Sequence, residues 1–413
     1  MTCLLGNRSN HRPHHRRGVT LVELLIVIGI TSLIAAVALP SVKTLLKDRK
    51  TNQAAIQVRG FIESAKAMAI AKGREVAVVL DRMSDSGDYN PAANNWFSTE
   101  ARDLHRNTVL RLSLAEVLPP YTGDLDNSTC MLAPSTVQGP SLGSGNNRAI
   151  INIAANPSLV ALLRSGLVDK IAIGDRSDLF DILVPISQFN ENDSMPPATK
   201  PPLGFAWIEF ENERTANQYS INHSVVPLTS GPHTFRIYCK PRRLYSKPMQ
   251  LPKGTCIDLG LSGMGVVGTN TFNFSAQWME AFEPNNTLGV NTVRPVYLVF
   301  DSRGSLSSLY GNFSGMPSMS RQLPNSDIYL LVGKTDKVLF PGAAISDPAI
   351  YGGSNLADST SYWLKISSSG GQVAMAPVLP PSLTPDATGV VSLATALAES
   401  RGAAQASVDL SAR

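Results

Sequence analysis

The segment at residues 16–27 has the sequence RRGVTLVELLIV, in which two arginines and a glycine precede a long apolar run. Between Val19 and Leu39 the only charged side chain is that of Glu23. A helix of this length spans about 30 Å, the thickness of the hydrocarbon core of a bilayer. We therefore predict a membrane helix over residues 19–39. Its one carboxylate needs a functional reason, because a charge inside a membrane is costly.

The charges outside this run are distributed unevenly. The first eighteen residues contain four arginines and no acidic residue, whereas the whole chain has 36 basic and 32 acidic residues. Without these four arginines the rest of the chain is formally neutral. We expect no nucleic-acid partner from this balance, because phosphate binding needs clustered basic side chains.

Two ordinary export signals are alternatives for the apolar run. A secretory signal peptide would be cleaved at an A-x-A site, which Ala36-Val37-Ala38 resembles. The run is longer than the apolar region of most signal peptides, however, and an acidic residue at its start is unusual. An uncleaved signal anchor would also leave Glu23 unexplained.

Residues 18–23, GVTLVE, resemble the class III prepilin signal of type IV pilins and type II secretion pseudopilins. The resemblance implies that a prepilin peptidase cleaves after Gly18 and that the new N-terminus, Val19, is N-methylated. Glu23 is then the fifth mature residue, and its carboxylate can neutralise the terminal ammonium of a neighbouring subunit during assembly. The family commonly has a helix-kinking proline at the position of Pro40.

The second half of the helix is expected to be amphipathic over residues 40–73. Apolar residues recur at helical spacing (Val58, Phe61, Ile62, Ala65 and Ala69), and Gly73 occupies the position of a C-terminal cap. A buried strand is predicted at 75–81, EVAVVLD. This helix, glycine and strand resemble the GspH/FimT (H-type) pseudopilins.

The resemblance implies an α+β, pilin-like fold: a long N-terminal helix, half membrane-spanning and half amphipathic, packed on an antiparallel β-sheet head. We expect a leader at 1–18, a head at 74–380 with a large insertion at about 83–246, and a flexible or weakly helical tail at 381–413. Further strands are predicted at Lys170–Ile173, Phe180–Ile186, Phe205–Phe210, Thr234–Cys239, Asp327–Val332 and Tyr362–Ile366. Residues Val296–Gly304 resemble a later strand of the H-type pseudopilins that ends in a glycine-containing turn.

The sequence offers few candidates for chemistry. Cys239 and Cys256 could form a disulfide outside the cytoplasm, or they could be separate buried thiols. The sequence GPSLG at 139–143 lacks the strand and helix that a nucleophile elbow requires, and the glycines at 263–268 favour a turn over a dinucleotide site. Residues 124–128, DLDNS, could hold calcium but are better explained as a solvated loop. We therefore predict no catalytic residues, metal or cofactor, and no enzyme activity.

The function predicted from these features is that of a prepilin-like structural subunit in a type II secretion pseudopilus or a type IV pilus-like filament. It implies a single-pass inner-membrane protein with a cytoplasmic N-terminus and a periplasmic or extracellular head. The implied partners are a prepilin peptidase/methyltransferase, other pilin or pseudopilin subunits, an inner-membrane assembly platform and membrane lipid. The alternative is an exported enzyme or binding protein that uses the helix only as an anchor.

Overall fold

A computed structural model describes twelve stretches of the chain. These are residues 21–83, 107–134, 147–164, 167–174, 180–181, 205–210, 232–267, 270–273, 295–311, 320–339, 347–382 and 392–411. The chain divides into two compact units, Met1–Lys50 and Thr51–Arg413. Each unit is described by itself below.

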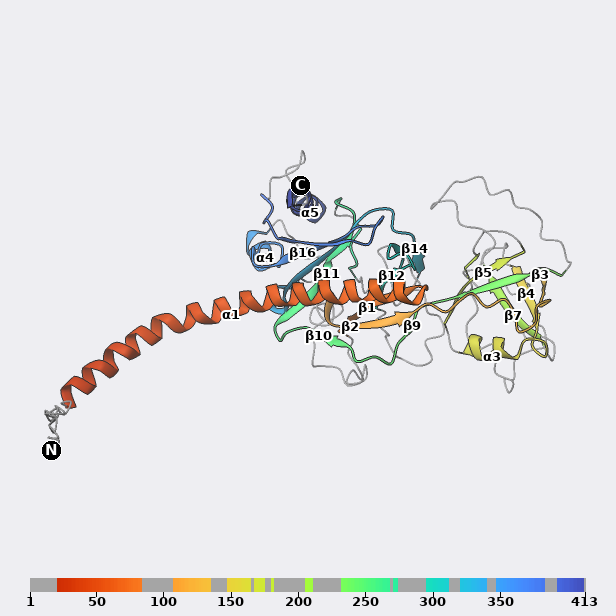
Figure 1. Cartoon of the computed structure of the whole chain (residues 1–413). Coiled ribbons are helices and arrows are strands. Elements are labelled where there is room, and N and C mark those ends of the chain that lie inside the picture. The colour runs from red at the N-terminus through yellow and green to blue at the C-terminus, as the bar shows by residue number, and fades with distance from the viewer. Residues whose placement is uncertain are drawn as a thin grey trace, which may run out of the picture. The chain divides into compact units, whose positions relative to one another are not determined.

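The helix predicted at the N-terminus is α1, which runs over 52 residues from Leu21 to Lys72 (Figure 1). Gly73 ends it with a φ of 65°. The amide of Gly73 donates to the carbonyl of Ile70, and the amide of Arg74 donates to that of Ala69. This pair of bonds is a Schellman motif, so the predicted glycine cap is confirmed.

The head is built on an antiparallel sheet of eleven strands. Nine strands follow the order β14-β13-β12-β1-β2-β11-β15-β16-β17, and β9 and β10 also pair with β2. The strands are β1 (Val76–Arg82), β2 (Thr108–Glu116), β9 (Arg242–Arg243), β10 (Met249–Gln250), β11 (Thr255–Met264), β12 (Val296–Phe300), β13 (Leu306–Gly311), β14 (Ser320–Gln322), β15 (Ile328–Lys334), β16 (Tyr362–Ile366) and β17 (Val373–Pro377).

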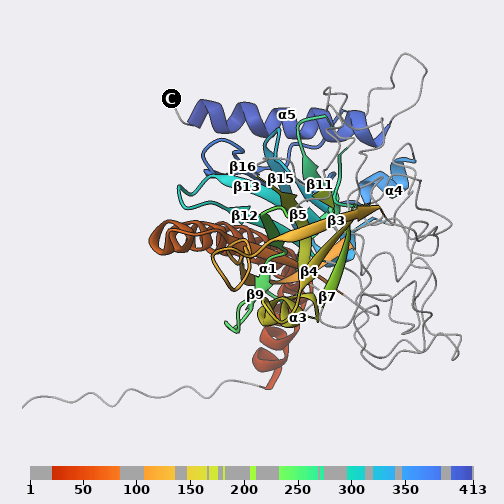
Figure 2. The same ribbon diagram turned by 90° about the vertical axis from the view of Figure 1, so that its right-hand side faces the viewer.

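The C-terminal half of α1 packs on one face of this sheet (Figure 2). Val58, Ile62, Ala65 and Ala69 are fully buried there, against alternate residues of β1, β2, β11, β12, β15 and β16. The alternation arises because successive side chains of a strand point to opposite faces. The predicted amphipathic stripe is therefore the stripe that packs.

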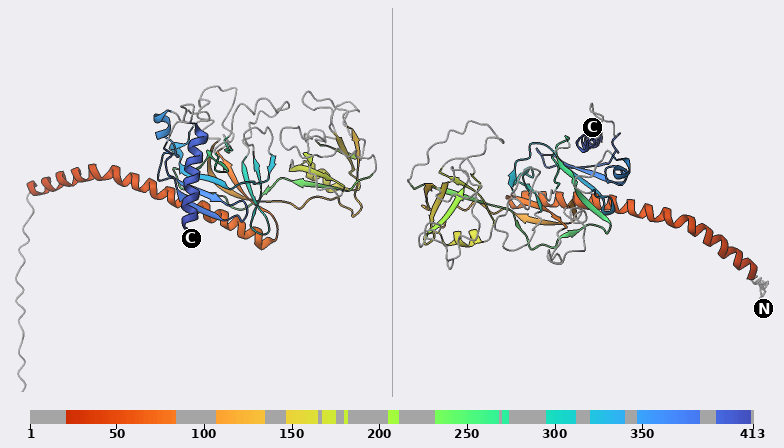
Figure 3. Two further views of the ribbon diagram at one scale, coloured as in Figure 1. Left: turned by 90° about the horizontal axis from the view of Figure 1, so that it is seen from above. Right: turned by 180° about the vertical axis from the view of Figure 1, so that it is seen from behind.

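The opposite face of the sheet is covered by α5 (Leu393–Ser411) (Figures 2 and 3). Its Ala396, Leu397 and Ala404 pack with Tyr329 and Trp363. Of the two alternatives predicted for the tail, flexible or weakly helical, the structure has a helix over residues 393–411. The segment is rich in alanine, which favours a helix, and burial of its apolar side holds that helix on the sheet.

The chain between β2 and β9 forms two further antiparallel sheets, each of three strands (Figure 3). Together with α3 (Pro157–Arg164) they have a hydrophobic core of their own, which includes Ile151, Leu159, Ile208 and Phe235. Their strands are β3 (Cys130–Pro134), β4 (Asn147–Asn152) and β7 (Phe205–Phe210) in one sheet, and β5 (Val168–Ile173), β6 (Phe180–Asp181) and β8 (Phe235–Cys239) in the other.

The insertion is consequently shorter than predicted. Residues 108–116 and 242–243 lie inside the predicted insertion, yet they form β2 and β9 of the main sheet. Val76 is opposite Glu116 and Leu80 is opposite Leu112, so β2 is the antiparallel neighbour of β1. Two short helices, α4 (Pro348–Gly352) and the 3₁₀ turn η5 (Thr335–Lys337), complete the described head.

Candidate functional site

The first half of α1 carries the features that the sequence singled out. Within residues 21–34, whose side chains the structure describes, the large apolar side chains are all more than half exposed in the single chain: Leu21, Val22, Leu24, Leu25, Ile26, Val27, Ile28, Ile30, Leu33 and Ile34. The Thr31 hydroxyl is satisfied within the helix, because it donates to the carbonyl of Val27 at 2.8 Å. Apolar residues that surround a helix on all sides need an apolar environment from outside the chain.

The structure describes only some of the residues predicted to act in processing and assembly. Gly18 and Val19 lie outside the described residues. Glu23 lies in the first turn of α1, where a carboxylate favours the positive end of the helix dipole. Pro40 lies within α1, so the helix continues through it, and the predicted kink remains a prediction.

In the part of the chain that the structure describes, no helix combines the length and the apolar character needed to cross a membrane. The described side chains of the predicted span are those of residues 21–34.

Cys239 and Cys256 do not form the disulfide that was one of the two alternatives for them. Cys130, Cys239 and Cys256 are buried free thiols, and burial raises the pKa of the Cys239 thiol to about 11. Cys239 lies in β8 and Cys256 in β11, so the two belong to different sheets. The alternative of separate buried thiols is the one that the structure has.

The polar residues of the loop at 124–128 make hydrogen bonds within the protein. One carboxylate oxygen of Asp124 accepts the Ser158 amide at 2.8 Å and so caps the N-terminus of α3. The side-chain oxygen of Asn156 accepts the hydroxyl of Ser128 at 2.8 Å and the amide of Asp124 at 3.0 Å. Asn156 is therefore not the side-chain cap that its position before Pro157 suggests.

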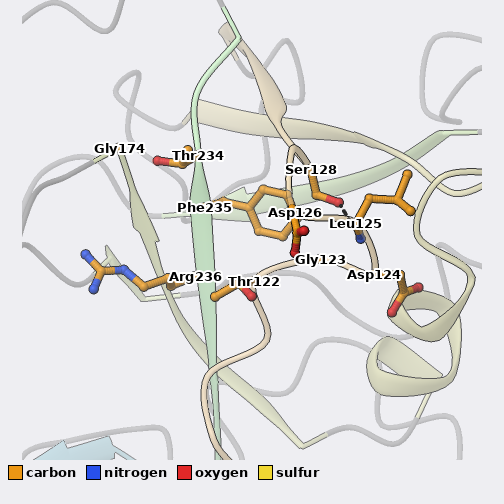
Figure 4. Close-up of a pocket in the computed structure, with 10 residues that line it drawn as sticks. All are labelled: Thr122, Gly123, Asp124, Leu125, Asp126, Ser128, Gly174, Thr234, Phe235 and Arg236. Carbon is orange, nitrogen blue, oxygen red and sulfur yellow. Dashed lines mark hydrogen bonds between the residues drawn. The ribbon is translucent and has the colours of Figure 1, made fainter.

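A shallow cavity of about 460 Å³ opens beside this loop (Figure 4). Its lining includes Thr122, Asp126, Thr234 and Arg236. Gly123, also in the lining, has a φ of 104°, and a Cβ atom there would overlap the side chain of Ser128. Among the described residues, no group of three or more histidine, cysteine or acidic side chains could hold a metal ion.

The other motifs fall into two groups. Residues 139–143 lie outside the described residues. At the glycine-rich segment β11 ends at Met264, and the Met264 amide donates to the carbonyl of Asn270. A Cβ atom on Gly263 would collide with that carbonyl, so the glycine permits a close backbone approach in a turn, as predicted.

No pattern in the sequence singled out the buried carboxylate of Asp258. Its two oxygens accept the Gly260 amide and the side-chain amide of Asn355, each at 3.1 Å. Complete burial raises the pKa of Asp258 to about 7, although these hydrogen bonds act in the opposite direction. The β11–β15 register shifts between Asp258 and Gly263, and the polar groups lie at that bulge.

Arg401 is a second buried ion that the sequence did not reveal. Its guanidinium donates to the carbonyls of Leu261 at 2.6 Å and Gly265 at 2.9 Å. It also lies 5.5 Å from the ring centre of Trp363 and 5.7 Å from that of Tyr329. Burial lowers its pKa to about 10, so it remains a cation at neutral pH and fastens α5 to the sheet.

The comparisons with known proteins agree with the N-terminal signal. Residues 13–39 match the family model of the prokaryotic N-terminal methylation motif, which is a type IV pilin-like signal. No curated protein and no solved structure matches the chain. The match covers Gly18, Val19 and Glu23, so the chain carries a prepilin-type signal at the predicted residues.

Proposed function

We propose that the protein is a prepilin-like structural subunit that is cleaved after Gly18 and N-methylated at Val19. Its apolar helix would then assemble into a type II secretion pseudopilus or a type IV pilus-like filament. The observation that carries the proposal is the coincidence of the methylation motif at 13–39 with an apolar helix exposed on all sides. Such a helix needs lipid before assembly and neighbouring helices after it.

Glu23 supplies the specific contact in this assembly. Cleavage creates an ammonium group at Val19, and in an apolar surrounding a lone ammonium or a lone carboxylate is strongly unfavourable. The carboxylate of Glu23 in one subunit would pair with the terminus of the next, which relieves both costs. The four arginines of the leader favour a cytoplasmic N-terminus before cleavage, with the head on the other side of the inner membrane.

We further propose that the protein is related to the GspH/FimT pseudopilins. This relationship is supported by the order of the first elements, in which α1 ends at a glycine and leads directly into a central strand of an antiparallel head. The partners would be a prepilin peptidase/methyltransferase, other pilin-like subunits and an inner-membrane assembly platform.

The first experiment determines the N-terminus of the protein extracted from membranes, by intact mass and N-terminal sequencing. The proposal expects N-methyl-Val19. A terminus at Leu39 would contradict it in favour of a secretory signal peptide, and an uncleaved chain in favour of a signal anchor. Gly18→Leu should block cleavage, whereas Gly6→Leu, a glycine within the leader, should leave it intact.

The second experiment separates processing from assembly. Glu23→Ala should leave cleavage at Gly18 largely intact and should reduce crosslinking to filament partners. Glu63→Gln is the matched control, since it removes a carboxylate from the same helix in the half that packs on the head. Normal crosslinking of the Glu23→Ala protein would contradict the proposed ammonium–carboxylate pair.

An anchored enzyme or binding protein is the second candidate, and the separate core and the cavity beside Asp126 favour it. The two candidates differ in what the helix sequence must do. Replacing residues 19–39 by an unrelated membrane-spanning helix should abolish the function of a filament subunit. An anchored enzyme or binding protein would keep its function after the same replacement.

A further inference from the structure

The cavity beside Asp126 exists because the chain bulges away from β8 at residues 122–129. At one end of the bulge, Tyr121 and Ile237 exchange two backbone hydrogen bonds, each at 2.8 Å. At the other end, Cys130 and His233 exchange two more, at 2.8 and 2.9 Å. The bulge therefore faces only the short stretch of chain between His233 and Ile237. Residues of both segments line the cavity, whose volume is about 460 Å³ (Figure 4).

The bulge leaves the backbone of Phe235 without a partner in the chain. Phe235 is opposite Ile173 in β5, but this pair has no hydrogen bonds, because the neighbouring pair of Thr234 and Gly174 is the hydrogen-bonded one. The amide and carbonyl of Phe235 consequently point to the other edge of β8, toward the bulge. Among the described residues nothing hydrogen-bonds to either group, although Phe235 is only 2% exposed. A buried backbone pair of this kind favours a partner from outside the chain.

The bulge itself is held in one shape. Gly123 has a φ of 104°, and a Cβ atom there would overlap the side chain of Ser128. The Ser128 hydroxyl oxygen accepts the amide of Leu125 at 3.2 Å. The carboxylate of Asp124 is occupied by the Ser158 amide of α3. This wall of the cavity is therefore preorganised, so a ligand would not have to order it.

The polar side chains that remain for a ligand come from both walls. Figure 4 shows the Asp126 carboxylate on the side of Phe235, and within the described part of the chain it forms no hydrogen bond or ion pair. Thr122 and Thr234 add hydroxyl groups, and Arg236 adds a guanidinium. With carboxylates and a guanidinium in one lining, the cavity suits neither a strong anion nor a strong cation.

We propose that this cavity binds a saccharide. The ligand must accept a hydrogen bond from the Phe235 amide, donate one to the Phe235 carbonyl and donate others to the Asp126 carboxylate. Each sugar hydroxyl both donates and accepts, and one neutral ring presents several of them. A free amino acid offers only donors at its ammonium end and only acceptors at its carboxylate end. The volume lies within the range of small-molecule sites, about 300–1,000 Å³. The proposal goes beyond assembly, because it gives the head a ligand of its own.

The test is saturation-transfer NMR on the full chain in a polyoxyethylene detergent, whose head group contains no sugar. The probes are glucose, galactose, mannose and N-acetylglucosamine, each at a concentration of about 1 mM, which suits an open site with few contacts. Saturation should pass to at least one of these sugars and not to glycine or lysine, the zwitterionic probes. Asp126→Asn should weaken binding of that sugar about tenfold, because a neutral amide replaces a charged acceptor.

Asn127→Ala is the matched control, since Asn127 is the next exposed residue of the same bulge and lies outside the cavity lining. It should leave the affinity unchanged. Asp126→Asn should also keep the Tm of the unaltered protein, which assigns its loss of binding to the cavity and not to unfolding.

Absence of transfer to all four sugars would overturn the proposal, and so would an unchanged affinity in Asp126→Asn or an equal loss in Asn127→Ala. Binding of glycine or lysine in place of the sugars would overturn it in favour of an amino-acid site. None of these results depends on cleavage at Gly18, so they leave the proposed function to its own experiments.

Discussion

The two halves of α1 belong to one continuous helix, yet their apolar residues have opposite surroundings. Ile28 in the first half is 56% exposed, whereas Ile62 in the second half is fully buried under the head. In the first half apolar residues occupy every side of the helix. In the second half they form one stripe, and the Arg59–Glu63 pair at 2.9 Å marks the outer side. The periodicity of the apolar residues, and not their number, separates the half that packs within the chain from the half that needs outside partners.

The largest expected effect compares one isoleucine from each half. Ile62→Ala should lower the free energy of unfolding of the head by about 3 kcal/mol, because it removes buried apolar surface and leaves a cavity. Ile28→Ala should change that free energy by less than about 0.5 kcal/mol. Urea unfolding of both proteins in the same detergent, followed by circular dichroism, measures the difference. Equal losses would mean that the first half also stabilises the head.

The next prediction tests whether α5 is held on the sheet by the hydrogen bonds of Arg401 as well as by the apolar packing that holds α1. Arg401→Met should cost about 2 kcal/mol, because the carbonyls of Leu261 and Gly265 lose their donors inside the protein. Ala406→Ser, at an exposed position of α5, is the control and should be nearly neutral in the same urea experiment. A neutral Arg401→Met variant would show that α5, like α1, is held by apolar packing alone.

A smaller effect concerns pH, which should act on the head only. The folded pKa of Asp258 is about 7, above its ordinary value, so the folded protein binds a proton that the unfolded chain has released. Stability from this group is therefore present at low pH and is lost as pH rises through 7, by about 1 kcal/mol between pH 6 and pH 8. Thermal unfolding should give a lower Tm at pH 8 than at pH 6. Asp258→Asn should remove most of that difference, and an unchanged difference would assign the pH dependence to another group.

The smallest effect lies on the outer side of the second half of α1. Arg59→Gln breaks an ion pair between side chains that are about half exposed, 47% and 48%. The expected loss is about 0.3 kcal/mol, since water screens both charges. A loss above about 1 kcal/mol in urea unfolding would mean that this side of the helix also contributes to the packed structure.

Several parts of the fold could be predicted because they depend on local chemistry. The amphipathic stripe at Val58 to Ala69 follows helical periodicity, and Gly73 can take the left-handed conformation that ends a helix. The strands β7 and β16 were predicted with the same bounds, since short β-branched and aromatic runs carry that signal themselves.

Other parts could not be predicted because they depend on contacts between distant residues. The alanine-rich segment at 393–411 is only weakly helical by itself, and its fixed position comes from Arg401 reaching carbonyls about 140 residues earlier in the chain. Cys239 and Cys256 are close in sequence, but strand pairing places them in different sheets. Asp258 resembles any strand aspartate until the β11–β15 bulge encloses it.

The sequence by itself determined the prepilin-type signal, with Gly18, Val19 and Glu23 at the matched positions, because a peptidase recognises a short linear segment. It also determined that α1 has two different halves, because periodicity is a local property. Only the tertiary structure decided that β2 and β9 belong to the head and that α5 covers its second face. Those features come from pairing and burial between residues far apart in the chain, and no local pattern specifies them.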